Sequence, residues 1–178
     1  MHRPLLTATA ALIGLVAPAV AAAAPSTSAT GTVTVDGSVA ARCQFTTGTA
    51  TITLGELAKP DGSFDPTTID GQNRTLQGWC NGASSSMTVN AASLVNVTSP
   101  PTGFSNQVDF TATALANSQS ATDTNSTDNT AGSPVTVGAF SGDIKVTLSA
   151  SSSHGGSTLK MVAGAYAGDV LVTLTPAV

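Results

Sequence analysis

Apolar and polar residues alternate with a period of two along most of the chain. In residues 31–39 three valines alternate with polar residues, and in residues 49–57 isoleucine and leucine alternate with threonine. The three valines are Val33, Val35 and Val39. Such alternation places one set of side chains on each face of a strand, and no stretch sustains the period of a helix. The pattern predicts an all-β fold.

Further strands are expected where the same alternation is bounded by glycine, proline, asparagine or serine, residues that end strands and favour turns. These segments are residues 74–80, 86–97, 107–115, 143–150, 157–162 and 168–175. About seven or eight short strands in a chain of this length predict a β-sandwich. Of the two long connections, residues 58–73 and 116–134, the second has so few apolar residues that we expect a mobile loop.

The first 24 residues have the organisation of a signal peptide. Arg3 precedes an apolar run over residues 5–20, and four alanines follow at 21–24. This run is shorter than the roughly 20 residues that a membrane-spanning helix needs, and it matches the basic start, apolar centre and small-residue cleavage site of an export signal. We expect cleavage after Ala24, with Ala22 and Ala23 as alternative sites, and residues 25–178 forming one exported domain that has no transmembrane span.

Export determines what the two cysteines, Cys43 and Cys80, are expected to do. Thiols oxidise outside the cytosol. A metal-binding or redox-active pair would need a Cys-x-x-Cys spacing or a nearby histidine, and the sequence has neither. We therefore predict a disulfide between Cys43 and Cys80.

Composition argues against catalysis and nucleic-acid binding. Charged residues make up 9% of the chain, against roughly 25% in an average soluble domain, and the net charge is −4. Six basic residues are too few for a phosphate-binding surface. His154 is the only histidine after the signal peptide and Glu56 the only glutamate, so acid–base and metal chemistry lack side chains. We predict no enzyme activity, no cofactor and no metal.

Two weaker features keep alternatives open. Four oxygen-bearing residues in the second long connection are spaced somewhat like a calcium loop, but the usual glycine and bidentate glutamate are missing, so a solvated polar loop is the simpler interpretation. These residues are Asp123, Asn125, Thr127 and Asp128. Trp79 is either a core residue packed against the disulfide or a platform on which a sugar ring stacks.

Both ends of the chain carry motifs that point to a family. Residues 31–43 read Gly-Thr-Val-Thr-Val-Asp-Gly-Ser-Val-Ala-Ala-Arg-Cys, and the second cysteine follows a tryptophan at Trp79-Cys80. Residues 163–176 read Ala-Gly-Ala-Tyr-Ala-Gly-Asp-Val-Leu-Val-Thr-Leu-Thr-Pro. Together these motifs resemble the spore coat protein U family and the archaic chaperone–usher pilus subunits that are similar to it. The family's closing motif falls on Gly164, Tyr166 and Asp169.

The resemblance implies an immunoglobulin-like sandwich that lacks one strand. In that family a periplasmic chaperone first fills the resulting groove, and an N-terminal strand of the next subunit then replaces it, adding a strand to a sheet edge. In this chain residues 25–42 are either that donor strand, with Val33, Val35 and Val39 as its apolar face, or the first strand of the domain itself.

Two functions are therefore expected. The first is a structural subunit of a bacterial surface filament or coat that passes through the periplasm to the cell surface. Its partners would be copies of itself or related subunits, together with a periplasmic chaperone and an usher. The alternative is a stand-alone secreted or surface-bound β-sandwich that acts as an adhesin or binds a glycan, with Trp79 and Tyr166 among its contacts.

Overall fold

A computed structural model describes residues 28–125 and 130–178. The predicted signal peptide, residues 1–24, lies outside the described residues, as do Thr127 and Asp128 of the calcium-like spacing. The chain divides into two units, Met1–Ser38 and Val39–Val178, and all the strands belong to the second.

The described residues form eleven strands and one short 3₁₀ helix, η1 (Pro66–Thr68), with no α-helix among them. The strands are β1 (Cys43–Thr47), β2 (Asn73–Cys80), β3 (Ser86–Ala91), β4 (Leu94–Val95), β5 (Phe104–Ser105), β6 (Gln107–Ala116), β7 (Gln119–Thr124), β8 (Val135–Thr136), β9 (Phe140–Ser153), β10 (Lys160–Met161) and β11 (Val170–Thr175). The predicted all-β fold is confirmed.

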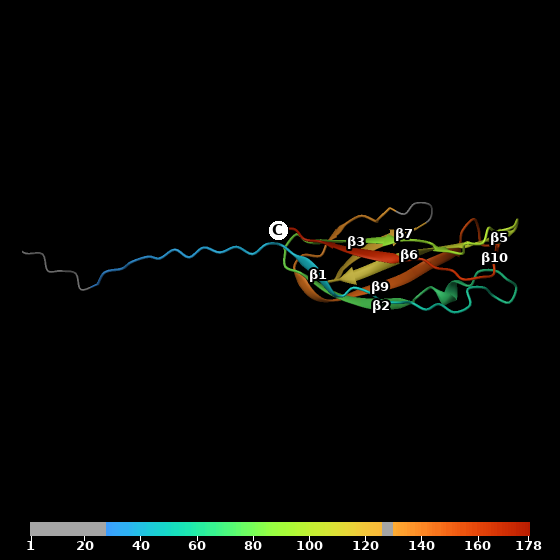
Figure 1. The fold of residues 1–178 in the computed structure, drawn as a ribbon, viewed down its shortest axis with the longest axis horizontal. Helices are drawn as coiled ribbons and strands as arrows, with labels where there is room; N and C mark the ends of the chain where they lie inside the picture. Colours follow the sequence, from blue (N-terminus) through green and yellow to red (C-terminus); the bar gives the residue numbers. More distant parts are fainter. Residues whose placement is uncertain (1–27, 126–129) are drawn as a thin grey trace, which may run out of the picture. The chain divides into compact units, whose positions relative to one another are not determined.

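Two sheets contain nearly all of these strands (Figure 1). The larger has the order β1-β2-β9-β6-β4, and β7 also pairs with β6. The smaller has the order β11-β3-β8. All pairings within these two sheets are antiparallel, and only the short pair β5 and β10 is parallel.

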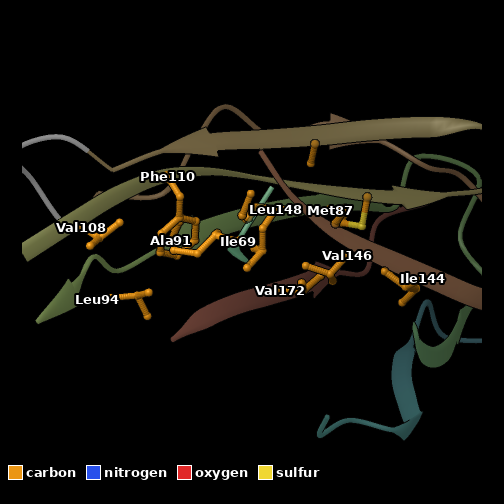
Figure 2. Packing of buried hydrophobic residues seen from close by; sticks show 14 of the residues in the cluster. Ile69, Met87, Ala91, Leu94, Val108, Phe110, Ile144, Val146, Leu148 and Val172 are labelled. Atoms are coloured by element: carbon orange, nitrogen blue, oxygen red, sulfur yellow. The ribbon is translucent and has the colours of Figure 1, made fainter. Parts of the chain in front are cut away.

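Inward-facing residues of both sheets share one hydrophobic core (Figure 2). Along β6 every second residue is buried, from Val108 at 0% exposure and Phe110 at 2% to two alanines at 0%. Opposite them lie Met87 and Val89 of β3, also at 0%. The period of two in the sequence therefore becomes a sandwich-like arrangement in which each sheet buries one face.

The predicted disulfide is confirmed. Cys43 and Cys80 are directly opposite each other on β1 and β2 and are bonded, and no cysteine is free. The bridge fixes the start of β1 to the end of β2.

The prediction of a mobile loop over residues 116–134 is wrong for its first half, where β7 forms a hairpin with β6. Asn117 and Ser118 connect the strands with φ angles of 46° and 62°. Two consecutive positive φ angles are typical of the two-residue turn that suits the twist of a hairpin. Polar residues can form β7 because its threonines face threonines of β6, with hydroxyl contacts of 2.8 Å for Thr111–Thr124 and 3.2 Å for Thr113–Thr122.

The two strands predicted closest to the N-terminus are absent from the described structure. Residues 28–42 contain no strand, and the chain first enters a sheet at Cys43. Val33, Val35 and Val39 are 87%, 88% and 84% exposed, so they take no part in the core of the domain. Residues 49–57 alternate in burial as predicted but pair with no strand of either sheet.

Candidate functional site

An apolar groove of about 390 Å³ runs beside the last strand of the domain. One wall consists of residues 48–52 and Leu54, and the other of residues 168–172 at the start of β11. Arg74 also lines it, and the floor is apolar and comes from β2, β4, β6 and β9. The floor residues are Leu76, Leu94, Phe110, Val146 and Leu148.

The first wall is a segment outside the sheets in which few backbone groups are hydrogen-bonded. β1 ends at Thr47, after an irregularity in its pairing with β2 between Phe45 and Thr47. Within the described part of the chain, residues 49–56 make no backbone–backbone hydrogen bond. Ile52 and Leu54 nevertheless pack against the core, which holds this segment against the domain.

The second wall is the free edge of β11. This strand pairs with β3 through six consecutive residue pairs, from Val170–Ala91 to Thr175–Ser86. In the described chain β3 is its only partner strand, so the edge of β11 that faces the groove carries unpaired N–H and C=O groups. The groove therefore lies between two backbone edges that could each accept an additional strand.

Apolar side chains in the groove are only partly covered. Ile52, Leu54, Leu76 and Val170 are each half-buried at the surface of the core. Removing such surface from water stabilises a complex by roughly 25 cal/mol per Å². A strand with small apolar side chains on one face would complete their burial.

One basic side chain enters the groove. Arg74 belongs to β2 and has the same parity as Leu76, Gly78 and Cys80, so it shares their inward face. Its Nε donates a 2.7 Å hydrogen bond to the backbone oxygen of Thr51, and one terminal nitrogen donates a 2.7 Å bond to the oxygen of Asn73.

The N-terminal segment that contains the three valines is fixed at its C-terminal end by hydrogen bonds to Asn81. Asn81 accepts a hydrogen bond from the backbone N–H of Arg42 at 2.6 Å, and its side-chain amide donates to the oxygen of Ala40 at 3.0 Å. Residues 40–42 are thereby tied to the end of β2. Val33 and Val35, further from this tie, remain almost fully exposed.

The closing motif inferred from the family resemblance lies in two places. Gly164 has a φ of 139°, and a Cβ at this position would lie 2.6 Å from the side-chain nitrogen of Asn96. The hydroxyl of Tyr166 contacts the backbone oxygens of Val162 at 2.9 Å and Ser105 at 3.2 Å, and burial raises the pKa of this phenol. Only Asp169 of the three lines the groove.

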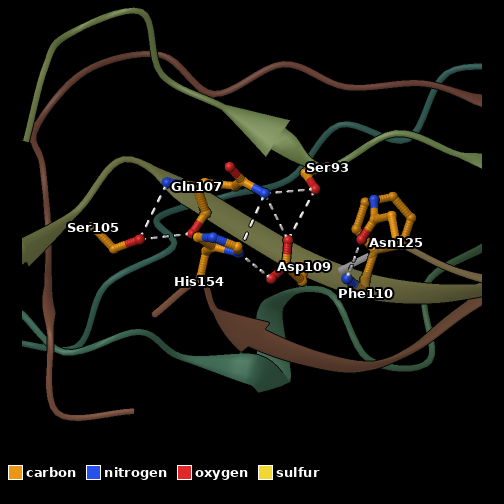
Figure 3. A network of polar contacts seen from close by, with 7 residues as sticks. All are labelled: Ser93, Ser105, Gln107, Asp109, Phe110, Asn125 and His154. Carbon is orange, nitrogen blue, oxygen red and sulfur yellow. Dashed lines mark hydrogen bonds and ion pairs between the residues drawn. The ribbon is translucent and has the colours of Figure 1, made fainter. Parts of the chain in front are cut away.

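A polar network at the base of β6 contains the histidine and is shown in Figure 3. His154 Nδ1 lies 2.7 Å from Asp109 Oδ2, and Gln107 Nε2 donates to Asp109 Oδ1 at 2.9 Å. The hydroxyl of Ser93 donates to the same carboxylate at 2.9 Å. Serine and histidine both bond the carboxylate rather than each other, so the network connects β6 to Ser93 and to the residue that follows β9.

Asp123 and Asn125, the two described residues of the calcium-like spacing, hydrogen-bond to the backbone of other strands. The Asp123 carboxylate accepts a 2.7 Å hydrogen bond from the backbone N–H of Ala91. Asn125 is 2% exposed, and its oxygen accepts a 2.9 Å bond from the N–H of Phe110. Within residues 28–125 and 130–178, no three acidic, histidine or cysteine side chains gather in a way that could hold a metal ion.

Trp79 lies outside the core cluster, which corrects the interpretation of this residue as a core side chain. It is half-buried and lines a shallow hollow beside the disulfide, together with residues 41–44 and Pro176. The correction follows from the parity of β2, because Gly78 and Cys80 point inward and the residue between them cannot.

No family model matches the chain, and no curated protein matches it. Among the described residues, no helix has the length and apolar character needed to cross a membrane.

Proposed function

We propose that the protein is a structural subunit that assembles by donating an N-terminal strand to the groove of another copy. The observation that carries the proposal is the apolar groove between two unpaired backbone edges, in a chain whose N-terminal segment exposes alternating valines. Addition of a strand at a sheet edge supplies backbone hydrogen bonds, and alternate side chains fill pockets.

The dimensions of the groove favour the pair Val33 and Val35. Its wall on β11, residues 168–172, is about five residues long, roughly 16 Å at the rise of a strand. An extended segment of that length turns two or three side chains inward. Val33 and Val35 occupy neighbouring inward positions, whereas Val39 is separated from them by Gly37 and is close to the residues tied down by Asn81.

On this proposal the domain is an immunoglobulin-like sandwich that lacks one strand, and the wider role is that of a subunit of a surface filament or coat exported through a periplasm. An unpaired sheet edge is prone to indiscriminate pairing. A subunit in transit therefore needs a temporary cover, which is the role of a periplasmic chaperone before an usher joins subunits. The similarity of both chain ends to the spore coat protein U family supports the same interpretation.

The test compares two double variants of the full chain that add the same charge to opposite faces of one segment. In Val33→Asp/Val35→Asp the carboxylates would enter an apolar groove without a partner, which is strongly unfavourable. In Thr32→Asp/Thr34→Asp they would face solvent. We expect the valine variant to remain a folded monomer and the threonine variant to assemble like the wild type, as measured by analytical ultracentrifugation with near-ultraviolet circular dichroism.

Two results would contradict the proposal. Equal assembly of both variants would show that the valine face is not buried between copies. A wild-type chain that stays monomeric at high concentration, and binds no peptide of residues 28–42, would instead favour the stand-alone adhesin or glycan-binding module.

A further inference from the structure

Arg74 presents a positive charge in a groove with an apolar floor, and among the described residues it has no ion-pair partner. Its hydrogen bonds go to the backbone oxygens of Thr51 and Asn73. Asp169 also lines the groove, yet the only ion pair among the described residues is His154 with Asp109. Arg74 is exposed as a residue, so water reaches its side chain while the groove is open.

An inserted strand would disturb both the hydrogen bond from Arg74 to Thr51 and the hydration of the Arg74 guanidinium. The carbonyl of Thr51 belongs to the wall whose backbone has no other hydrogen bonds, and Arg74 occupies it. Covering the groove would also remove water from the guanidinium, and a charge that loses water without gaining a partner is costly. A strand with only neutral side chains therefore meets a penalty at this position.

We propose that Arg74 is the specificity-determining residue of the groove and that it selects an incoming segment carrying a carboxylate, which in this chain is Asp36. The inference rests on the proposed strand donation and adds to it the charge by which the correct segment is recognised. Once the segment is in place, the guanidinium exchanges the Thr51 carbonyl for the Asp36 carboxylate. Inward-pointing charges protect free sheet edges from wrong partners in the same way.

Asp36 suits this role by charge and by position. It is the only acidic residue in residues 28–42, and it directly follows Val35. In an extended segment it lies on the face opposite Val33 and Val35. Its carboxylate would thus stay at the solvent-exposed mouth of the groove while the valines are buried, and Arg74 is the exposed basic residue that lines this groove.

A double-mutant cycle tests the pairing. The acceptor is the full chain with Val33→Asp/Val35→Asp, so that its own segment does not compete, and the probe is a fluorescent peptide of residues 28–42. Dissociation constants are measured for acceptors with Arg74 or R74M against peptides with Asp36 or D36N. We expect D36N to weaken binding to the Arg74 acceptor about tenfold, as for a charge-assisted hydrogen bond, and to leave binding to R74M unchanged.

Three controls make the result specific. K145M removes an exposed basic residue of β9 outside the groove and should preserve the full effect of D36N. R74K keeps the positive charge, so D36N should still weaken binding to this acceptor, but by less than to the Arg74 acceptor. If R74M does not give the near-ultraviolet circular dichroism of the folded chain, R74Q replaces it in the cycle.

The outcomes separate this inference from the proposed function. If D36N weakens binding to both acceptors equally, or to neither, Arg74 does not recognise Asp36. Strand donation still stands in that case, provided that the V33D/V35D peptide does not bind. Failure of the wild-type peptide to bind any acceptor, or equal binding of the V33D/V35D peptide, overturns strand donation and the role of Arg74 together.

Discussion

The disulfide illustrates how a single covalent contact supports the groove. Cys43 and Cys80 are 37 residues apart in sequence, and the bridge joins β1 to β2 immediately before the chain leaves the sheet to form the first groove wall. Cross-linking removes freedom from the unfolded chain and keeps β1 at its partner. The residues that follow, Ile52 and Leu54, then reach the core from a fixed starting point.

We expect Cys43→Ser/Cys80→Ser to lower the free energy of unfolding by about 2 to 5 kcal/mol, the usual cost of removing a native disulfide. The double variant leaves no thiol that could pair wrongly. Urea unfolding of the variant and of the oxidised wild type measures the difference. Equal unfolding midpoints for oxidised and reduced wild-type protein would contradict the expectation.

Tyr166 makes stability sensitive to alkali. Burial raises the pKa of its phenol above the ordinary value of 10.0, and the hydroxyl bonds the oxygens of Val162 and Ser105. A group with a raised folded-state pKa holds its proton more tightly when folded, so its contribution is complete below about pH 10 and is lost as the pH rises through the folded-state pKa.

Stability should therefore fall above about pH 10 in the wild type and fall less in Tyr166→Phe, which has the same lysines but no phenol. Urea midpoints across that range measure the effect. Tyr166 is the only tyrosine, so the absorbance of tyrosinate follows its titration directly. Identical pH profiles for the two proteins would show that the phenol is not responsible.

At the scale of elements, alternation predicted the strands whose two faces differ in polarity. Segments predicted at 74–80, 107–115 and 168–175 became β2, β6 and β11 with small changes at their ends. β7 was missed because its exposed positions are threonine and serine and only Ala121 is fully buried. Its signal was the Asn117-Ser118 pair, which can adopt the positive φ angles of a hairpin turn.

The candidate site was only partly predictable. The alternation of apolar and polar residues shows which face of a strand is buried, but it does not show which strands pair with each other. Residues 49–57 were expected to form a strand with one apolar face. Ile52 and Leu54 do pack against the core, but the segment joins no sheet, and the absence of a partner strand cannot be read from a sequence. The same limit applies to Val33 and Val35, whose pattern fits an internal strand as well as an external one. Arg74 was not singled out, since a lone arginine at the start of a strand carries no local signal for the groove it enters.

For the molecule as a whole, an open groove implies that the domain is less stable than it would be with the groove filled by a strand. Several apolar side chains at the groove are only half-buried, and the two backbone edges beside it are unpaired. A ligand that binds only the folded state raises stability with its concentration, by about 2.7 kcal/mol at a hundred times the dissociation constant. Occupancy of the groove should therefore be visible in thermal unfolding.

We expect the peptide of residues 28–42, at saturating concentration, to raise the unfolding temperature of the Val33→Asp/Val35→Asp chain by roughly 5 to 10 °C, because each kcal/mol shifts a domain of this size by about 2 to 4 °C. Differential scanning calorimetry measures the shift. A peptide with T32D/T34D should act like the wild type, whereas one with V33D/V35D should have no effect. An equal shift of the unfolding temperature with the T32D/T34D and V33D/V35D peptides would show that the peptide binds outside the groove.

The position of the segment and the groove on one chain also determines the symmetry of any assembly. Two copies joined through them contribute different surfaces, so the contact is heterologous and no two-fold axis relates them. Each copy added through such a contact leaves one vacant groove and one unused segment, and growth continues as an open fibre unless the rotation closes a ring. Such a fibre would have polarity, because one end would display Arg74 and the apolar floor and the other end Val33 and Val35. A protein that terminates growth at one end could then not terminate it at the other.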